Sequence, residues 1–226
     1  MAETDTTQDT DQGRRCRGRP QVRPDDETRR IVYDAARHEF TASGYAATSM
    51  DAVARRAGIS TKTLYRLIPN KALLFEGMMS DRLDRFVANI DLHAVEHANI
   101  EEALYAALLA CAELTLDDEV IALQRMVLQE AGKPSDPAGT FYRKAIVRTR
   151  AALADWLRAQ QKRGLIELDD VEEAAGMLLG MVASAPRRAA MFGRVPLPSR
   201  AQIEARVRSC AALFLRGCQA RPTGGR

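Results

Sequence analysis

The sequence predicts an all-α protein, and three features of the chain favour that class. Alanine, leucine, arginine and glutamate dominate the composition, whereas aromatic residues make up only 5%, a balance typical of helices. Apolar residues recur three and four positions apart through most of the chain. No window alternates apolar and polar residues for long enough to indicate a strand. We therefore expect about nine helices, three in an N-terminal head and six in a C-terminal body.

Start and stop signals delimit the expected helices. Acidic residues at 25–27 suit the positive end of a helix dipole, and Gly44 follows as a stop. Glycine and proline interrupt residues 132–137, and prolines interrupt 196–198. Ser199 and Gln202 form a capping-box pattern. The expected helices are residues 25–43, two short helices within 49–68, 70–93, 100–116, 119–131, 138–163, 169–186 and 199–217.

Residues 48–71 predict a helix-turn-helix. Thr48 or Ser49 can cap the first helix, since a hydroxyl there accepts a hydrogen bond from a helix N–H group. Gly58 suits the left-handed conformation that ends this helix. Ser60 can cap a second helix, whose Leu64 and Leu67 would face inward. In such a motif the second helix enters the major groove of DNA.

The distribution of charge agrees with a DNA-binding head. Residues 1–13 carry a net charge of −4, residues 14–71 carry +7, and residues 72–226 are neutral in sum. A basic segment on a neutral body suits docking on phosphates. On charge alone, a basic surface that is merely solvated is an equally good interpretation. The helix-turn-helix pattern favours docking on phosphates.

The cysteine and hydropathy patterns indicate a cytoplasmic protein without metal or cofactor. Cys16, Cys111, Cys210 and Cys218 show no metal-binding spacing, and no secretory signal precedes them, so we expect reduced thiols. His93 and His97 are four residues apart but lack a third ligand. The longest nearly uncharged stretch, residues 174–187, is shorter than the roughly 20 residues needed to span a bilayer.

The head resembles a known family. The helix-turn-helix continues into Thr63-Leu64-Tyr65 and then into Pro69-Asn70-Lys71-Ala72-Leu73-Leu74. This run resembles the DNA-binding domain of tetracycline-repressor-like (TetR) regulators of bacteria, although Ile68 stands where the family usually has phenylalanine. The motif resemblance covers about residues 27–74. It implies a basic arm at 1–24 that is flexible, a DNA-binding domain at 25–71, and an effector-binding and dimerisation domain at 72–221.

The resemblance also implies roles for the residues of the head. Lys62 and Arg66 are the expected guanine contacts, because cationic donors suit the O6 and N7 acceptors of that base. Beside them, the exposed side of the recognition helix carries Thr61 and Thr63, and the expected phosphate contacts are Tyr65, Thr48 and Lys71. The partner would be a pseudo-palindromic operator in double-stranded DNA.

The N-terminal arm contains Arg17-Gly18-Arg19-Pro20, which resembles the core of AT-hook segments. Such segments place arginines in the narrow, strongly negative minor groove of A·T-rich DNA. A basic tail that adds only non-specific attraction is the alternative.

The body is expected to bind an effector and a second copy of the chain. By resemblance, a cavity among its helices would take a small apolar or amphipathic molecule, lined by Met126, Gln129, Trp156 and Met177. The helix at 169–186 is apolar on almost every side, which predicts burial against both the core and a partner. We expect a homodimer through this helix and the last one, with Leu178, Val182, Val207 and Phe214 at the interface.

The resulting hypothesis is a repressor that an effector releases from its operator. Two alternatives remain at this point. A thiol-redox sensor could use Cys111, Cys210 or Cys218, although nothing in the sequence indicates a lowered thiol pKa. A small helical enzyme would need convergent nucleophile, base or metal groups, and no such set stands out, so we predict that the chain is not an enzyme.

Overall fold

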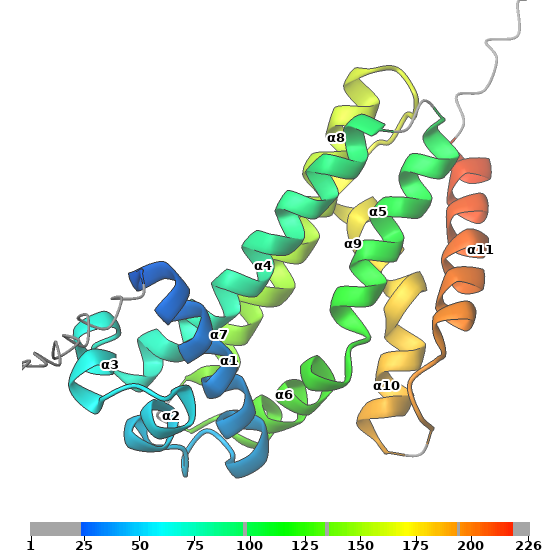
Figure 1. The fold of residues 1–226 in the computed structure, drawn as a ribbon. Helices are drawn as coiled ribbons and strands as arrows, with labels where there is room; N and C mark the ends of the chain where they lie inside the picture. Colours follow the sequence, from blue (N-terminus) through cyan, green and yellow to red (C-terminus); the bar gives the residue numbers. More distant parts are fainter. Residues whose placement is uncertain (1–23, 97–98, 134–135, 194, 219–226) are drawn as a thin grey trace, which may run out of the picture.

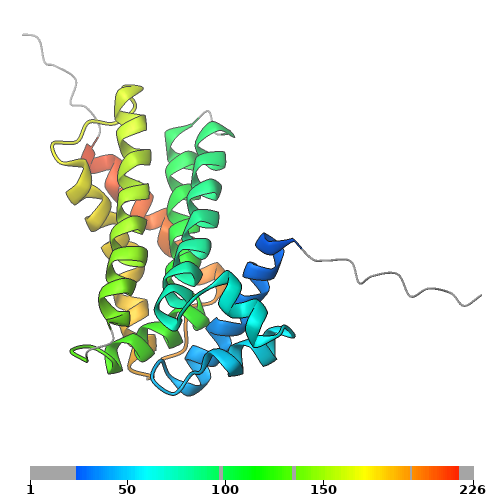
Figure 2. The same cartoon turned by 90° about the vertical axis from the view of Figure 1, so that its left-hand side faces the viewer.

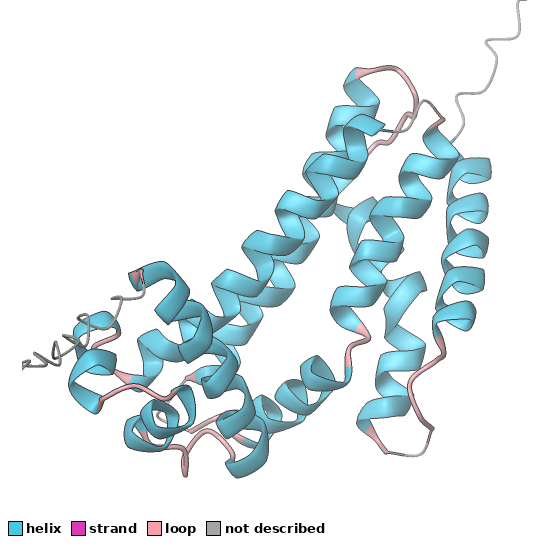
Figure 3. Ribbon diagram, viewed as in Figure 1, coloured by secondary structure: helices cyan, strands magenta, loops and turns pink. Residues whose placement is uncertain are grey.

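The computed structural model describes residues 24–96, 99–133, 136–193 and 195–218, and every regular element in these ranges is a helix (Figure 3). The predicted all-α class is therefore confirmed. Among the described helices, none combines the length and the apolar composition that a membrane span requires. Cys16, Arg17 and Arg19, and the side chains of His93, His97 and Cys218, lie outside the described part of the chain.

The chain folds into a small head followed by a larger helical body (Figure 1). The head holds three helices, which are α1 (Asp25–Ser43), α2 (Met50–Ala57) and α3 (Thr61–Leu67). The body begins with α4 (Lys71–Glu96), α5 (Ile100–Thr115) and α6 (Asp118–Gln129). Two long helices follow, each interrupted by a wider π-helical segment, and α11 (Arg200–Cys218) ends the described chain. The first long helix runs through α7 (Pro137–Phe141), η1 (Tyr142–Val147) and α8 (Arg148–Lys162), and the second through α9 (Val171–Leu179), η2 (Gly180–Ser184) and α10 (Ala185–Met191).

Local signals place the helices of the head where the sequence predicts them. The side chains of Ser49 and Ser60 accept hydrogen bonds from Ala52 N and Thr63 N, and so cap α2 and α3. Gly58 ends α2 at φ 67°, in the left-handed region. The turn between α2 and α3 is thus built from the residues that predicted it.

The core of the head extends into the body. Leu64 of α3 and Phe75 of α4 belong to one apolar cluster with α1 and α2. The same cluster takes in Leu123 of α6 and Phe141 of α7. Although we expected a domain boundary after residue 71, the first turns of α4 and one face of α6 pack as part of the head. Figure 2 shows the head, coloured blue to cyan, at one end of the long helices of the body.

A second apolar cluster forms the core of the body. In it α4 lies beside α8, α5 lies beside α11, and α8 lies beside α9 (Figure 1). Leu178, Val182 and Val207 are almost completely buried in this cluster, within their own chain. These three side chains are therefore inaccessible to a partner, contrary to our expectation, because the sequence pattern does not distinguish core burial from interface burial. Phe214 is half-buried at the edge of the cluster.

Arg206 of α11 stabilises the wider turn at η2. A π-helical segment carries an extra residue per turn, and such segments are often found at functional sites. The guanidinium of Arg206 donates to the backbone oxygens of Met181 and Val182, with its Nε 3.0 and 2.8 Å from them. These contacts supply donors to carbonyl groups inside η2 and hold α11 against it.

Candidate DNA interface and buried pocket

The helix α3 presents a polar face to solvent and an apolar face to the head. Leu64 and Leu67 point inward and are buried, whereas Thr61, Lys62, Tyr65 and Arg66 are exposed. Tyr65 remains 48% exposed. Thr63 is half-buried, and its hydroxyl lies 2.8 Å from the capping hydroxyl of Ser60. The predicted outward face of the recognition helix is therefore present.

Contacts at both ends hold α3 in position. At its start, Thr61 donates from Oγ1 to Asp51 Oδ1 of α2 over 3.1 Å. At its end, Arg29 of α1 donates from Nη1 to the backbone oxygen of Leu67 over 2.8 Å. That carbonyl is one of those a helix C-terminus leaves without an intrahelical partner. The face that would meet DNA is thus anchored to both other helices of the head.

Arg66 has an acidic partner. Its guanidinium binds Asp25 at the start of α1 in a bidentate arrangement, with N–O distances of 2.9 and 2.7 Å. The hydrogen bond from Arg66 is the main cause that lowers the pKa of the Asp25 carboxyl. Both side chains are more than half exposed, so DNA can compete for the arginine. By contrast, Lys62 has no hydrogen-bond or ion-pair partner among the described residues.

Lys71 is a brace within the head. Its Nζ donates to the backbone oxygens of Tyr45, Ala46 and Thr48, at 2.8, 3.1 and 3.0 Å. The ammonium group also lies 4.8 Å from the centre of the Tyr45 ring. Desolvation in this half-buried place lowers the pKa of Lys71. Since an ammonium group has three N–H donors and all three are used, Lys71 has none left for a phosphate, contrary to our expectation.

Thr48 is also an internal residue. Only 3% of it is exposed, and its hydroxyl lies 3.0 and 2.8 Å from the backbone oxygens of Glu39 and Gly44. Neither the helix cap nor the phosphate contact expected of Thr48 fits this geometry, because the cap is Ser49. The sequence shows a hydroxyl of the right type near a helix start, but the position of that hydroxyl depends on how the loop folds back on α1.

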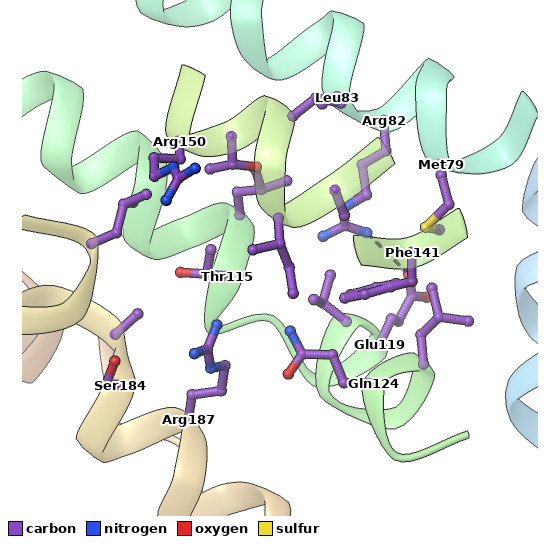
Figure 4. A pocket seen from close by; sticks show the side chains of 18 of the residues that line it. Met79, Arg82, Leu83, Thr115, Glu119, Gln124, Phe141, Arg150, Ser184 and Arg187 are labelled. Carbon is purple, nitrogen blue, oxygen red and sulfur yellow. Dashed lines mark ion pairs between the residues drawn. The ribbon is translucent and has the colours of Figure 1, made fainter. Parts of the chain in front are cut away.

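A pocket of about 240 Å³ lies among the helices of the body, on the side next to the head (Figure 4). Its wall takes residues from every helix between α4 and α10, together with Arg37 of α1. Both π-helical segments border it, η1 through Ala145 and Ile146 and η2 through Gly180, Ala183 and Ser184. The lining is mainly apolar, as is usual for sites that bind small molecules.

An ion-pair network forms the side of the pocket next to the head. Arg37 of α1 donates from Nη1 to Glu119 Oε2 of α6 over 3.1 Å. Arg82 of α4 lies 3.7 Å from the same carboxylate and 3.1 Å from Asp117 Oδ1. Arg37 also pairs with Asp34 over 2.8 Å. One carboxylate at the pocket thus connects the head to both α4 and α6.

The four residues that we expected to line the pocket lie elsewhere. Met126 is buried in the head cluster, Trp156 is buried in the body cluster, Gln129 is exposed, and Met177 is 58% exposed. None of them belongs to the wall. Sequence reasoning missed Gln124, Thr149 and Arg187, and it assigned no role in the pocket to Gly176 and Gly180. These two glycines line the pocket, and their spacing of four residues was the available signal.

The described cysteines are unsuited to redox chemistry. Cys111 is fully buried, and burial raises the pKa of its thiol to about 12. Cys210 is also buried, and its pKa is raised by the same cause. Because the thiolate is the reactive form, neither has the character of a sensor. No group of three or more potential metal ligands occurs among the described residues.

Comparison with known proteins assigns both parts of the chain. The family model described as "AefR-like transcriptional repressor, C-terminal domain" matches residues 102–219, and that described as "Bacterial regulatory proteins, tetR family" matches residues 32–78. The curated relative YhgD of Bacillus subtilis, an uncharacterized HTH-type transcriptional regulator, is 33% identical over 87 residues. These are 36% of this chain and 45% of YhgD, so the match spans less than half of that relative.

Two solved structures are similar over most of this chain. A putative TetR-family transcriptional regulator from Mesorhizobium loti is 26% identical, with a TM-score of 0.75, over 88% of this chain and 100% of that one. The flavonoid-responsive regulator FrrA is 27% identical, with a TM-score of 0.66, over 87% of this chain and 100% of its own.

Proposed function

Because the chain belongs to the TetR family of bacterial transcriptional regulators, which are non-enzymatic DNA-binding proteins, we propose that it is a repressor released from a pseudo-palindromic operator by a small apolar or amphipathic effector. The observation that carries this proposal is the pocket, whose wall includes Arg37 of the head. The similarity to FrrA, named as a flavonoid-responsive regulator, is in line with control by a small molecule.

In the proposed complex α3 lies in the major groove. Lys62 and Arg66 read guanine O6 and N7, with Thr61 and Thr63 beside them at the start of the helix. Tyr65 contacts phosphate through its exposed hydroxyl end and sets the register without reading sequence. The arginine pair of the N-terminal arm, Arg17 and Arg19, adds contacts in a flanking A·T-rich minor groove. Lys71 and Thr48 support this interface from behind, by fixing the loop that leads into α2.

Dimerisation places two such heads on one operator. The chain would pair through the outer faces of its last helices, where Leu213 of α11 is 61% exposed beside the half-buried Phe214. Homodimers are typical of the family, and Leu213 is the large apolar side chain that this face of α11 leaves accessible. Leu213→Glu should therefore give monomers with weaker operator binding, measured by light scattering and by fluorescence anisotropy. A Leu213→Glu protein that remains dimeric would place the interface elsewhere.

Effector binding and operator binding would compete through the pocket. A molecule inserted between α4, α6 and α8 would change how α4 and α6 lie against the head, and hence the spacing of the two recognition helices. The effector needs only a different affinity for the two spacings. A coupling free energy of about 1–3 kcal/mol would lower operator affinity about 5- to 150-fold.

The test starts from the operator. Genomic fragments retained by the protein, beginning with its own upstream region, give a site whose affinity is measured by anisotropy at fixed salt. Small organic acids, alcohols and flavonoids are then screened for release of that DNA. Gly180→Phe, which extends a side chain into the pocket, should abolish the response, whereas Met177→Trp, on the exposed side of α9, should keep it.

Two results would contradict the proposal. If Gly180→Phe responds like the wild type, the pocket is not the effector site. If Lys62→Ala leaves the preference among operator variants unchanged, α3 does not read the sequence as proposed.

A further inference from the structure

Arg187, in the wall of the pocket, differs from the other half-buried arginines because its guanidinium has no acceptor among the described residues. In the described part of the chain, the half-buried arginines 29, 37, 82, 148, 158 and 206 each donate to a carboxylate or a backbone carbonyl. Arg187 of α10 is equally half-buried and has no such acceptor among the described residues. Its side chain extends from α10 into the pocket (Figure 4).

The burial of Arg187 has a cost that nothing in the described chain offsets. Removing a guanidinium from water without an acceptor is unfavourable. The effect is visible in its pKa, which burial lowers from the ordinary value. The wall near Arg187 is made of Gly180, Ala183 and Ser184 of η2, none of which bears a negative charge. An unpaired guanidinium that faces a cavity is suited to bind a ligand that supplies the missing acceptor.

Two further polar groups of the wall are also without partners. Gln124 of α6 is 8% exposed and Thr149 of α8 is 5% exposed, and neither side chain forms a hydrogen bond with another described residue. Gln124 points into the pocket in Figure 4, as Arg187 does. Most buried polar side chains in folded proteins are hydrogen-bonded. The pocket therefore offers a cation and two neutral polar groups in an otherwise apolar wall.

Glu119, the one carboxylate among the wall residues, does not pair with Arg187. Glu119 is paired with Arg37 and Arg82 on the side next to the head. Arg150, at the exposed rim of the pocket, adds a second arginine without an ion-pair partner among the described residues. The charge left uncompensated in the pocket is therefore positive.

We infer that the pocket takes an amphiphilic monocarboxylate, with its carboxylate on Arg187 and its apolar body against the opposite wall. The inference rests on the proposed function, in which the same pocket is the effector site. A guanidinium fork and a carboxylate match in a bidentate geometry. Gln124 donates from its amide to the same headgroup, while Leu83, Phe141 and Ile146 provide the apolar surface. A neutral alcohol of the same shape can accept a hydrogen bond from Arg187 but brings no negative charge to offset that of the guanidinium.

The experiment compares acids with alcohols of the same skeleton. Decanoate and 4-phenylbutyrate are titrated into the full-length protein by calorimetry, beside 1-decanol and 4-phenyl-1-butanol. We expect at least one acid to bind about 10- to 100-fold more tightly than its alcohol, the range expected for a hydrogen-bonded charge pair. Arg187→Met, which keeps the apolar stem, should remove this difference. Arg188→Met, the matched control at the next and exposed position of α10, should preserve it.

The stability of the free protein is a second readout. If Arg187 is an uncompensated half-buried charge, Arg187→Met should leave the melting temperature of the unliganded protein unchanged or raised. A lowered melting temperature would show that Arg187 has a structural partner and would overturn the inference.

The outcomes separate this inference from the proposed function. If no acid binds more tightly than its alcohol, or if Arg187→Met and Arg188→Met behave alike, the carboxylate assignment is wrong. Alcohols that release operator DNA from the wild type but not from Gly180→Phe would then leave the pocket as the effector site. If Gly180→Phe releases operator DNA in response to every compound as the wild type does, the pocket is not the effector site.

Discussion

Replacing Lys71 by methionine tests whether the lysine braces the head or contacts DNA. Lys71→Met keeps most of the stem but removes the three hydrogen bonds to Tyr45, Ala46 and Thr48. A hydrogen bond to a charged group contributes about 1.5–3 kcal/mol at best. Because water can reach the carbonyl groups of this half-buried loop, we expect a total loss of about 2–3 kcal/mol in unfolding free energy. For a chain of this length, that loss lowers the melting temperature by about 5–10 °C.

The assay pairs thermal unfolding with operator binding at several salt concentrations. Each phosphate contact contributes about 0.9 to the slope of log affinity against log salt. If Lys71 is a brace, Lys71→Met lowers the melting temperature, weakens operator binding through the loosened loop, and leaves the slope unchanged. The matched control is Lys62→Met, at an exposed lysine of α3 without a partner among the described residues, which should leave the melting temperature unchanged. A slope that falls by about one in Lys71→Met, with normal stability, would refute the brace.

Three further predictions address the Arg66–Asp25 pair of the head, the contact between α1 and α4, and the buried thiol of Cys111. Asp25→Asn should tighten operator binding severalfold in an anisotropy titration, because Arg66 then no longer has to break its ion pair with Asp25 before it contacts DNA. An unchanged affinity would mean that breaking the Arg66–Asp25 pair costs no free energy. Gly77→Ala should destabilise the protein by about 1–3 kcal/mol in urea unfolding, because the added Cβ would overlap the end of the Tyr33 side chain. A neutral result would show that the ring moves aside. Cys111 should resist thiol reagents at pH 8 until the protein unfolds, since the pKa of its thiol is raised to about 12; rapid labelling of the native protein would revive the redox alternative.

The features that the sequence predicted correctly depend on local interactions. The ends of α2 and α3 follow from Ser49, Gly58 and Ser60, each of which acts within four residues of its own position. The outward face of α3 follows from helical periodicity alone. Lys71 was misassigned because its acceptors lie in a loop more than 20 residues earlier, which only the folded head brings to it. Thr48 was misassigned because its hydroxyl turns back to the oxygens of Glu39 in α1 and of Gly44. Residue type and spacing do not predict such a contact.

The pocket was misplaced for a different physical reason. The helix at 169–186 is apolar on almost every side, so helical periodicity does not decide which of its faces borders a cavity. Met177 was chosen for its residue type, but its side chain is 58% exposed. The wall residues Gly176, Gly180 and Ser184 recur every four positions on another face of the same helix. There the glycines leave open space in place of a side chain.

In the switch that we propose, the coupling between effector and head would depend more on apolar packing than on ion pairs. The pair between Arg37 and Glu119 is partly exposed, since Glu119 keeps 58% of its side-chain surface, and such pairs contribute about 0–1 kcal/mol. That is too little for a coupling of about 1–3 kcal/mol. Met79, Leu123 and Phe141, however, belong both to the wall of the pocket and to the core of the head. Since each buried methylene contributes about 0.8 kcal/mol, an effector that removes two or three methylene equivalents of these side chains from the head core would supply a coupling of the required size.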